Sequence, residues 1–233
     1  RPIIKNAVLA WNIAFEEAGF IDAIEVKIQP DDADWSAGDI RYNVLRWTSS
    51  PNPPFGGYGP SFTNPRTGEI LGADIMLEWI YLTNRVRYSE IFENLENRNN
   101  DFCHNSLLKQ ENRIFGKLAT EALDLNENEI SRLYEEDLYQ LILHEVGHTL
   151  GLNHNFAAST LHNNSDVHNP EITYKEGLSS SVMDYHALNI APIGVEQGQY
   201  ADVKPGKYDI LAIKYGYTPK LSKKDLNNML EKY

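Results

Sequence analysis

Three histidines and one glutamate lie close together in the sequence, at spacings that suit metal chemistry. Residues four apart on a helix share a face, so His144 and His148 can direct their imidazoles at one point. Glu145 is one residue further round the helix, where its carboxylate can act on a water molecule rather than bind the metal. Gly151 can end the helix because glycine adopts left-handed backbone conformations, and the chain can then return His154 as a third ligand. Three protein ligands leave a position for water, which is typical of catalytic rather than structural zinc.

The chemistry expected of such a site is activation of a metal-bound water molecule for hydrolysis. Zinc lowers the pKa of its bound water to about 7, and Glu145 is placed to take the proton and pass it to the leaving group. The alternative interpretation is a helix whose histidines only pack or face solvent. The number of fixed positions in the pattern makes a chance match rare.

The extended motif resembles that of the metzincin metallopeptidases, which have a methionine-containing turn below the zinc. Met183 follows the third histidine in the expected order, and the resemblance implies that it forms an apolar floor under the ligands. In astacin-like and serralysin-like metzincins, a tyrosine two residues after this methionine can contact zinc and stabilise the oxyanion. The resemblance gives that role to Tyr185, the alternative being a packed or hydrogen-bonded tyrosine. Those families usually have histidine where this chain has Asp184, whose carboxylate we expect to bind a ligand histidine or the loop.

The segments 46–51, 154–159 and 189–192 resemble a bacterial family of large, mostly exported metzincin-like proteins, in which other domains flank the catalytic domain. This resemblance implies a bacterial protein that acts in the periplasm, at the cell surface or outside the cell. The chain opens at Arg1 without an initiator methionine, so we expect a processed or excised part of a longer precursor, whose signal is not in this chain.

The same resemblance implies how a peptide or protein substrate binds. The substrate is expected to lie extended along the edge strand above the cleft, paired by main-chain hydrogen bonds. The residues expected in that strand are Gly72, Ala73, Asp74 and Ile75. Leu188 and Ile190, which follow the methionine turn, are the candidates for one wall of the pocket that receives a substrate side chain.

Helical spacing and turn residues predict the elements that must position these side chains. A helix is predicted over residues 5–18, where apolar residues recur at helical spacing and Gly19 is a natural stop. A long helical stretch is predicted over residues 127–150, with Asn126 and Glu129 as a capping pair. Further helical segments are predicted over residues 84–125 and 208–215 and after Ser222, with Asp225 completing the cap.

Strands are predicted where apolar and polar residues alternate or β-branched residues gather, at residues 23–29, 39–47 and 69–81. The segment 48–68 is rich in proline and glycine and is predicted to be a loop, as is the asparagine- and serine-rich segment 153–181.

Together with the resemblance, these elements predict an α+β, metzincin-like zincin fold. We expect a twisted, mixed and mostly parallel sheet with an antiparallel edge strand, two long helices behind it and an irregular C-terminal lobe. Residues 1–154 would form an N-terminal lobe with the sheet and the zinc helix. Residues 155–233 would form a C-terminal lobe with the methionine turn and the C-terminal helices, and the two lobes together would make one catalytic domain.

Composition excludes several classes of partner. The chain of 233 residues is 42% hydrophobic, enough for a substantial core, and carries a net charge of −12. This acidity argues against binding to nucleic acid or to an anionic membrane surface. No apolar run approaches the roughly 20 residues that span a bilayer. The single cysteine, Cys103, excludes an internal disulfide; it is expected to be an idle thiol, the alternative being a zinc ligand in a latent form.

No functional role is expected for the remaining titratable residues. His104, His162, His168 and His186 are predicted to be solvated, although a second metal near His162 and His168 is an alternative. A cluster of acidic residues offers a possible calcium site, but its spacing is not that of an EF-hand and a solvated loop is favoured. That cluster consists of Asp31, Asp32, Asp34 and Asp39.

The sequence therefore predicts a zinc-dependent endopeptidase. One alternative is a peptidase that removes only terminal residues, which a cleft blocked at one end would mark. Another is a catalytically idle binding or adhesion module on the same scaffold. The intact glutamate and histidines argue against this alternative.

Overall fold

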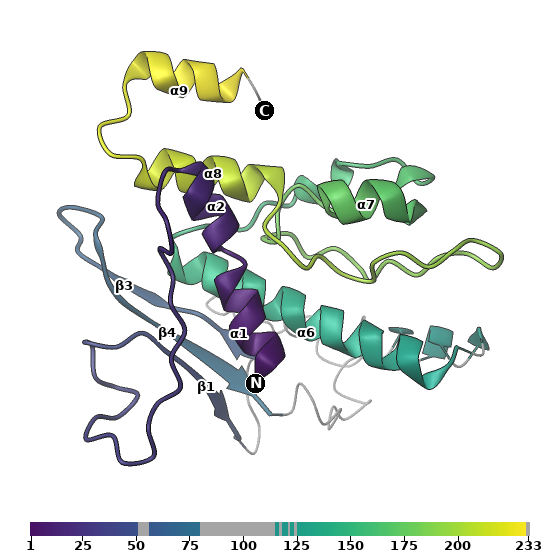
Figure 1. Ribbon diagram of the computed structural model, residues 1–233, viewed down its shortest axis with the longest axis horizontal. Helices are drawn as coiled ribbons and strands as arrows, with labels where there is room; N and C mark the ends of the chain where they lie inside the picture. The colour runs from purple at the N-terminus through teal and green to yellow at the C-terminus, as the bar shows by residue number, and fades with distance from the viewer. Residues whose placement is uncertain (51–55, 80–114, 117, 121, 124, 232–233) are drawn as a thin grey trace, which may run out of the picture.

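The computed structural model describes residues 1–50, 56–79, 115–116, 118–120, 122–123 and 125–231 (Figure 1). Its helices are α1 (Pro2–Leu9), α2 (Asn12–Glu17), α6 (Glu127–Thr149), α7 (Pro170–Glu176), α8 (Lys207–Tyr217) and α9 (Lys223–Leu230), with the 3-10 turns η1 (Ala158–Thr160) and η2 (Asp166–His168). Its strands are β1 (Val44–Thr48), β2 (Gly57–Tyr58), β3 (Ser61–Thr63) and β4 (Ile70–Glu78). The chain thus has the predicted α+β fold with a mixed sheet. The prediction that the sheet is mostly parallel is wrong for the described strands, because β1 alone pairs parallel with β4, while β2 and β3 pair antiparallel.

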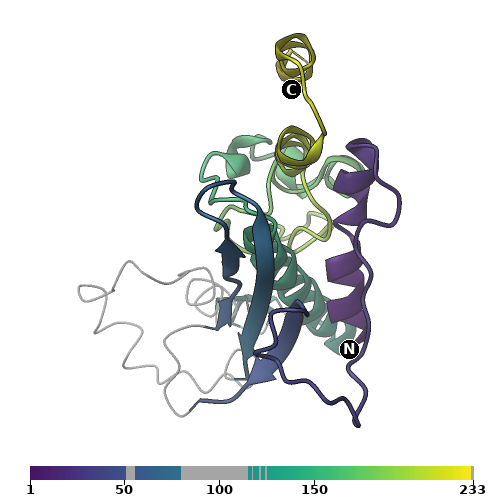
Figure 2. The same ribbon diagram turned by 90° about the vertical axis from the view of Figure 1, so that its left-hand side faces the viewer.

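The long helix α6 lies between the sheet and the N-terminal helices (Figures 1 and 2). It begins where the Asn126 side chain accepts hydrogen bonds from the backbone N–H groups of Asn128 and Glu129, which is the predicted cap. The Glu129 carboxylate accepts a hydrogen bond from the Tyr200 hydroxyl at 2.8 Å, so it ties the helix to the C-terminal part of the chain. The helix ends before Gly151, whose φ of +90° is the left-handed conformation that glycine tolerates best.

Strand β4 is the centre of the described sheet rather than its edge. β1 pairs parallel with β4 on one side, while β2 and β3 pair antiparallel with it. The four residues expected to pair with substrate are therefore already flanked: Asp74 and Ile75 face β1, and Gly72 and Ala73 face β3. The prediction that these residues form an edge strand is wrong, because the proline- and glycine-rich segment predicted to be a loop contributes two short strands.

Residues 23–29 form no strand, which contradicts the prediction from their alternating pattern. The side chain of Asn12 forms hydrogen bonds with both backbone groups of Ile24. It donates to the Ile24 carbonyl oxygen at 2.9 Å and accepts from the Ile24 N–H at 2.8 Å. At Ile24, the backbone groups that a neighbouring strand would bind are thus bound to α2. The next predicted strand also begins later than expected, at Val44, because residues 39–42 form a turn.

The predicted N-terminal helix is divided into α1 and α2 by a turn at Ala10 and Trp11. Trp11 is fully buried, and its indole N–H donates to the Leu143 carbonyl oxygen of α6 at 3.1 Å. Gly19 follows α2 with a φ of +93°, as expected of a stop. Of the two long helices expected, the described residues contain one, α6, and the position of the other is taken by this pair of short helices.

The C-terminal part of the chain contains more helix than predicted. The segment 153–181 includes η1, η2 and α7, although it was predicted to be loop. α8 and α9 confirm the predicted C-terminal helices, and Ser222 and Asp225 cap α9 reciprocally. α8 packs against α2, with the rings of Phe15 and Tyr217 5.0 Å apart, whereas α9 extends away from the body (Figures 1 and 2). Most of the predicted helical region 84–125, with Cys103 and His104, lies outside the described residues.

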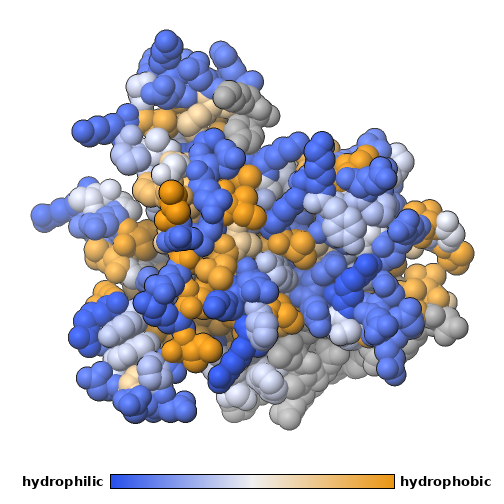
Figure 3. Space-filling model, in the orientation of Figure 1, coloured by the Kyte–Doolittle hydropathy of each residue, from blue (hydrophilic) through white to orange (hydrophobic). Residues whose placement is uncertain are grey.

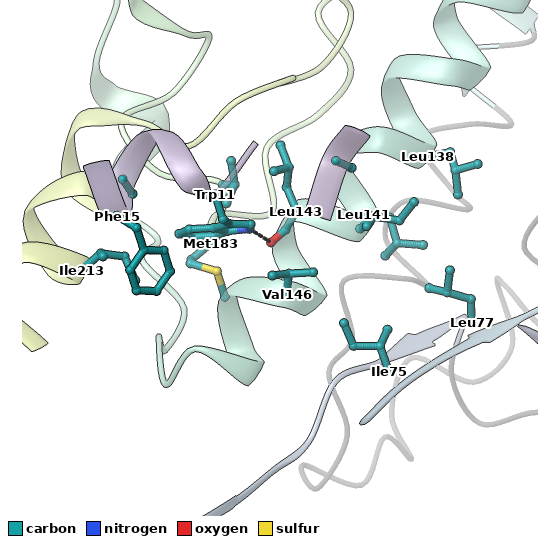
Figure 4. Close-up of a cluster of buried hydrophobic side chains, with 14 residues drawn as sticks. Trp11, Phe15, Ile75, Leu77, Leu138, Leu141, Leu143, Val146, Met183 and Ile213 are labelled. Atoms are coloured by element: carbon teal, nitrogen blue, oxygen red, sulfur yellow. Dashed lines mark hydrogen bonds between the residues drawn. The ribbon is translucent and has the colours of Figure 1, made fainter. Parts of the chain in front are cut away.

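The hydrophobic core joins the sheet, α6, the N-terminal helices and α8 (Figure 4). Ile75 and Leu77 of β4 face Leu141 and Val146 of α6, and Met183 lies on the opposite side of that helix beside Trp11. The face of the molecule in Figure 3 combines hydrophilic residues with several apolar patches. No helix among the described residues has the length and apolar character needed to cross a membrane.

Candidate metal centre

The structure brings the three predicted histidines together. His144 and His148 lie on the last turns of α6, and His154 returns to them after the helix has ended. One ring nitrogen from each histidine lies within 4.8 Å of the others, and the Nε2 atoms of His148 and His154 are 3.1 Å apart. Among the described residues this is the one group of three or more side chains placed to hold a metal ion.

Hydrogen bonds to backbone carbonyls orient two of these rings. Nδ1 of His144 lies 2.8 Å from the Val182 carbonyl oxygen, and Nδ1 of His148 lies 3.0 Å from that of Leu152. A carbonyl oxygen only accepts, so each Nδ1 carries the proton and each Nε2 has a lone pair available for a metal. Burial also lowers the pKa of His148, which favours the neutral ring that a metal requires.

This donor set fits a zinc ion. Three neutral imidazoles are a common ligand set of zinc with an open fourth position. In a tetrahedral site with Zn–N distances of about 2.0–2.1 Å, ligand nitrogens lie about 3.3 Å apart. The 3.1 Å between the Nε2 atoms of His148 and His154 is close to that value. Because all three ring nitrogens lie within 4.8 Å of one another, only small ring movements are needed for the three histidines to bind one ion.

Glu145 lies next to the first histidine and is completely buried beneath β2. The relative exposure of Glu145 is 0%, and both of its carboxylate oxygens are inaccessible to solvent. A Cβ on Gly57 would lie 2.9 Å from Oε1 of Glu145, and one on Gly59 would lie 2.5 Å from the Glu145 carbonyl oxygen. Only glycine permits β2 to approach this closely. The role of these glycines was not predicted, although the run Gly56-Gly57-Tyr58-Gly59 is a signal for it in the sequence.

Met183 packs directly under the zinc-binding motif. It is fully buried, and its sulfur lies so close to Gly147 that a Cβ there would overlap it. Gly147 lies between His144 and His148 on α6, so the lack of a side chain there lets the thioether reach the helix between two candidate ligands. The structure thus places Met183 where the apolar floor was predicted, and it adds Gly147 as a residue on which that arrangement depends.

Tyr185 lies beside the third histidine. Its hydroxyl oxygen is 2.5 Å from Nε2 of His154, and the two rings are 4.5 Å apart. The hydroxyl is therefore close enough to the metal centre to act on a substrate there, while its role in stabilising an oxyanion stays a prediction. The neighbouring Asp184 accepts hydrogen bonds from the backbone N–H of Ser159 at 2.8 Å and of Tyr185 at 2.6 Å. Of the two alternatives for this carboxylate, the structure selects the loop.

Two buried carboxylates hold the turn that carries Met183. Asp209 of α8 accepts from the Ser181 hydroxyl at 2.6 Å and from the backbone N–H groups of Val182 and Gly206, each at 2.8 Å. Burial raises the pKa of Asp209 to about 6 despite these bonds. Asp202 accepts from the Ser179 hydroxyl at 2.6 Å and the Leu178 N–H at 2.7 Å.

His186 is not the solvated side chain that was predicted. Its Nε2 lies 3.0 Å from the Asp202 carboxylate and its Nδ1 lies 2.9 Å from the Ala187 carbonyl oxygen. Nε2 of His186 also lies 2.5 Å from the side-chain nitrogen of Gln140, so the ring has three partners within the protein. Burial would raise the pKa of Asp202, but the hydrogen bond and charge of His186 and the Ser179 hydroxyl bond hold it below its usual value.

The other candidate residues lie apart from the centre. Nε2 of His162 bonds the Gly177 carbonyl oxygen at 2.8 Å, and His162 and His168 join no metal-binding group in the described part of the chain. The acidic loop forms no such group either, and Asp39 pairs with Arg41 at 2.6 Å. Leu188 is only 8% exposed and packs with Leu133 and Tyr200, with Ile190 against the same cluster, so Leu188 belongs to the core rather than to an open pocket wall.

Comparison with known proteins agrees with this geometry. Residues 126–233 match the profile of a protein family described as Met-zincin. That stretch contains all three histidines, Glu145, Met183 and Tyr185. No curated protein and no solved structure matches the chain. The family match over residues 126–233 and the clustered histidines together confirm the resemblance to metzincin-type proteins that the sequence predicted.

Proposed function

We propose that this chain is a zinc-dependent metalloendopeptidase. The observation that carries the proposal is the set of three imidazole nitrogens within 4.8 Å of one another, with Glu145 adjacent in the helix. The two carbonyl-bound Nδ1 atoms support it, because they leave Nε2 of His144 and His148 ready to bind a metal.

Each residue of the centre has a role in the proposed hydrolysis. Zinc, when bound, supplies a Lewis acid and lowers the pKa of a water molecule to about 7. Glu145 accepts the proton of that water and delivers it to the nitrogen of the leaving amine. The Tyr185 hydroxyl, beside His154, donates a hydrogen bond to the carbonyl oxygen as it gains negative charge.

Residues from both predicted lobes contribute to the centre. His144 and His154 lie within residues 1–154, whereas Tyr185 and the turn that holds His144 through Val182 lie within residues 155–233. We therefore propose that the two lobes form one catalytic domain. The resemblance of the segments 46–51, 154–159 and 189–192 supports a bacterial, exported protein with flanking domains that acts on peptides or proteins.

A catalytically idle binding module is the second candidate, and the burial of Glu145 favours it. A general base must reach water and substrate, yet the Glu145 carboxylate is fully buried against Gly57. Catalysis by the first mechanism requires β2 to move aside or the substrate to enter beside it. The idle module requires neither.

Three measurements on the zinc-loaded chain separate these functions. Zinc content is determined by metal analysis, and cleavage of a mixed peptide library is compared with and without a chelator. Peptides blocked at both ends report endopeptidase activity alone. We expect stoichiometric zinc, cleavage of blocked peptides and loss of cleavage with chelator. Glu145→Gln should retain zinc and lose cleavage, because the histidines remain and the base does not. Stoichiometric zinc without cleavage of any peptide would refute the endopeptidase and favour the binding module.

A further inference from the structure

Phe156 is a large apolar side chain beside the metal centre that faces solvent. It follows His154 by two residues and is 66% exposed. Its ring centroid lies 5.5 Å from that of His154 and 5.5 Å from that of Tyr185. The interplanar angles are 39° and 68°, and the 66% exposure shows that these neighbours cover only part of the side chain.

The backbone on both sides of Phe156 is fixed. The Asn155 N–H donates to the Met183 carbonyl oxygen at 3.0 Å, and the Ser159 N–H donates to the Asp184 carboxylate at 2.8 Å. Ala158, two residues after the phenylalanine, is fully buried. These bonds hold the segment against the methionine turn, so the ring is presented to solvent at a defined place next to His154.

The distance from Phe156 to the candidate ligand His154 is short enough for contact with a peptide whose scissile bond reaches the centre. Consecutive residues of an extended chain rise about 3.3 Å, so the residues flanking the scissile bond lie within a few ångström of the ligands. Aromatic rings contact one another at centroid distances of about 4.5–7 Å. The exposed ring of Phe156, 5.5 Å from a ligand ring, is therefore within reach of a flanking substrate side chain.

We infer that Phe156, with the edge of Tyr185, forms a subsite that selects a large apolar, preferentially aromatic, side chain of the substrate next to the scissile bond. This inference rests on the proposed peptidase function and adds a specificity-determining residue to it. Burying a phenyl group against Phe156 removes apolar surface of both groups from water, which a small side chain such as alanine does not achieve.

The test compares peptide pairs that differ only in Phe or Ala at positions within two residues of the scissile bond. Phe156→Ala should lower kcat/KM for the Phe peptide at one of these positions about tenfold, or ~1.4 kcal/mol, and change that for the Ala peptide less than about twofold. Phe156→Leu should give an intermediate loss. Tyr174→Leu, which alters an exposed aromatic residue on α7, is the matched control and should change neither value.

A binding measurement supplies a readout independent of turnover. In zinc-loaded Glu145→Gln protein, calorimetry should show that adding Phe156→Ala raises the Kd of the Phe peptide about tenfold and hardly alters that of the Ala peptide. Equal losses for both peptides, no loss, or a selective loss for peptides with Lys or Arg would overturn the inference. Failure of the wild-type chain to cleave any peptide would instead count against the proposed function, so the two failures are distinguishable.

Discussion

Gly147 lies where α6 and the methionine turn meet, and Gly147→Ala is predicted to weaken both the fold and the metal centre. A Cβ at this position would overlap the Met183 sulfur and lie 3.1 Å from Cζ2 of Trp11. Met183 and Trp11 are both fully buried, so neither can turn into solvent to relieve the overlap. The strain must then be taken up by α6 itself, between His144 and His148.

The expected magnitude has two opposing parts. Alanine in place of glycine inside a helix stabilises by about 0.8–1 kcal/mol. Forcing an extra methyl group into a packed core costs about 1–3 kcal/mol. The matched control is Gly216→Ala on α8, where a Cβ would have no neighbour within 4 Å and the helix gain is kept without the overlap. The free energies of unfolding of the two variants should therefore differ by about 1–3 kcal/mol, with Gly147→Ala the less stable.

Urea denaturation of the metal-free proteins, followed by tryptophan fluorescence, measures this difference. Chelator competition measures the zinc affinity, which should fall in Gly147→Ala and stay unchanged in Gly216→Ala, because only the first change lies between two ligands. In a Met183→Ala background the cost of Gly147→Ala should shrink, since the sulfur is gone. If Gly147→Ala proves as stable as Gly216→Ala and binds zinc equally well, the predicted contact between the methionine and the helix is refuted.

Two further predictions concern the groups that hold the centre in place. Burial raises the pKa of Asp209 in the folded chain to about 6, above its ordinary value of 3.8, so the stability contributed by its protonated form is complete below about pH 4 and is lost as the pH rises through about 6. Asp209→Asn should remove this part of the pH dependence, and urea unfolding of both metal-free proteins between about pH 4 and pH 7 measures it; a wild-type-to-variant difference that stays constant across this window would contradict the assignment. Trp11→Phe leaves a cavity and removes the donor to the Leu143 carbonyl oxygen, so the free energy of unfolding should fall by about 2–4 kcal/mol in a denaturant titration. A loss below about 1 kcal/mol would show that the indole is not the anchor that its burial implies.

The features that sequence analysis predicted correctly are determined locally. The cap at Asn126, the four-residue spacing of His144 and His148 and the stop at Gly151 all act within one or two helical turns. A helix fixes such relationships through its own geometry, whatever surrounds it. The strand β4 was similarly predicted from its own residues and from the turn that precedes it.

The features that were not predicted from the sequence depend on contacts between residues that are distant in the sequence. Whether β4 is an edge or a central strand is decided by β2 and β3, whose few residues carry no alternating pattern of their own. His186 is removed from solvent by Asp202, which lies in another segment of the chain. The close approach of Gly57 to Glu145 likewise becomes visible only once β2 is placed over α6. A pattern in one segment does not contain this information.

The orientation of the candidate metal ligands depends both on contacts that are local in sequence and on contacts between distant segments. The carbonyl group that orients the second histidine of the motif belongs to Leu152, in the turn that directly follows the helix. The one that orients His144 belongs to Val182, whose N–H is in turn bound by Asp209 of α8 at 2.8 Å. One ligand is thus set by the motif itself and the other by the C-terminal helix. The motif alone therefore does not orient both ligands. The residues that orient them extend from α6 to α8, and this part of the chain lies within the residues 126–233 that match the Met-zincin family.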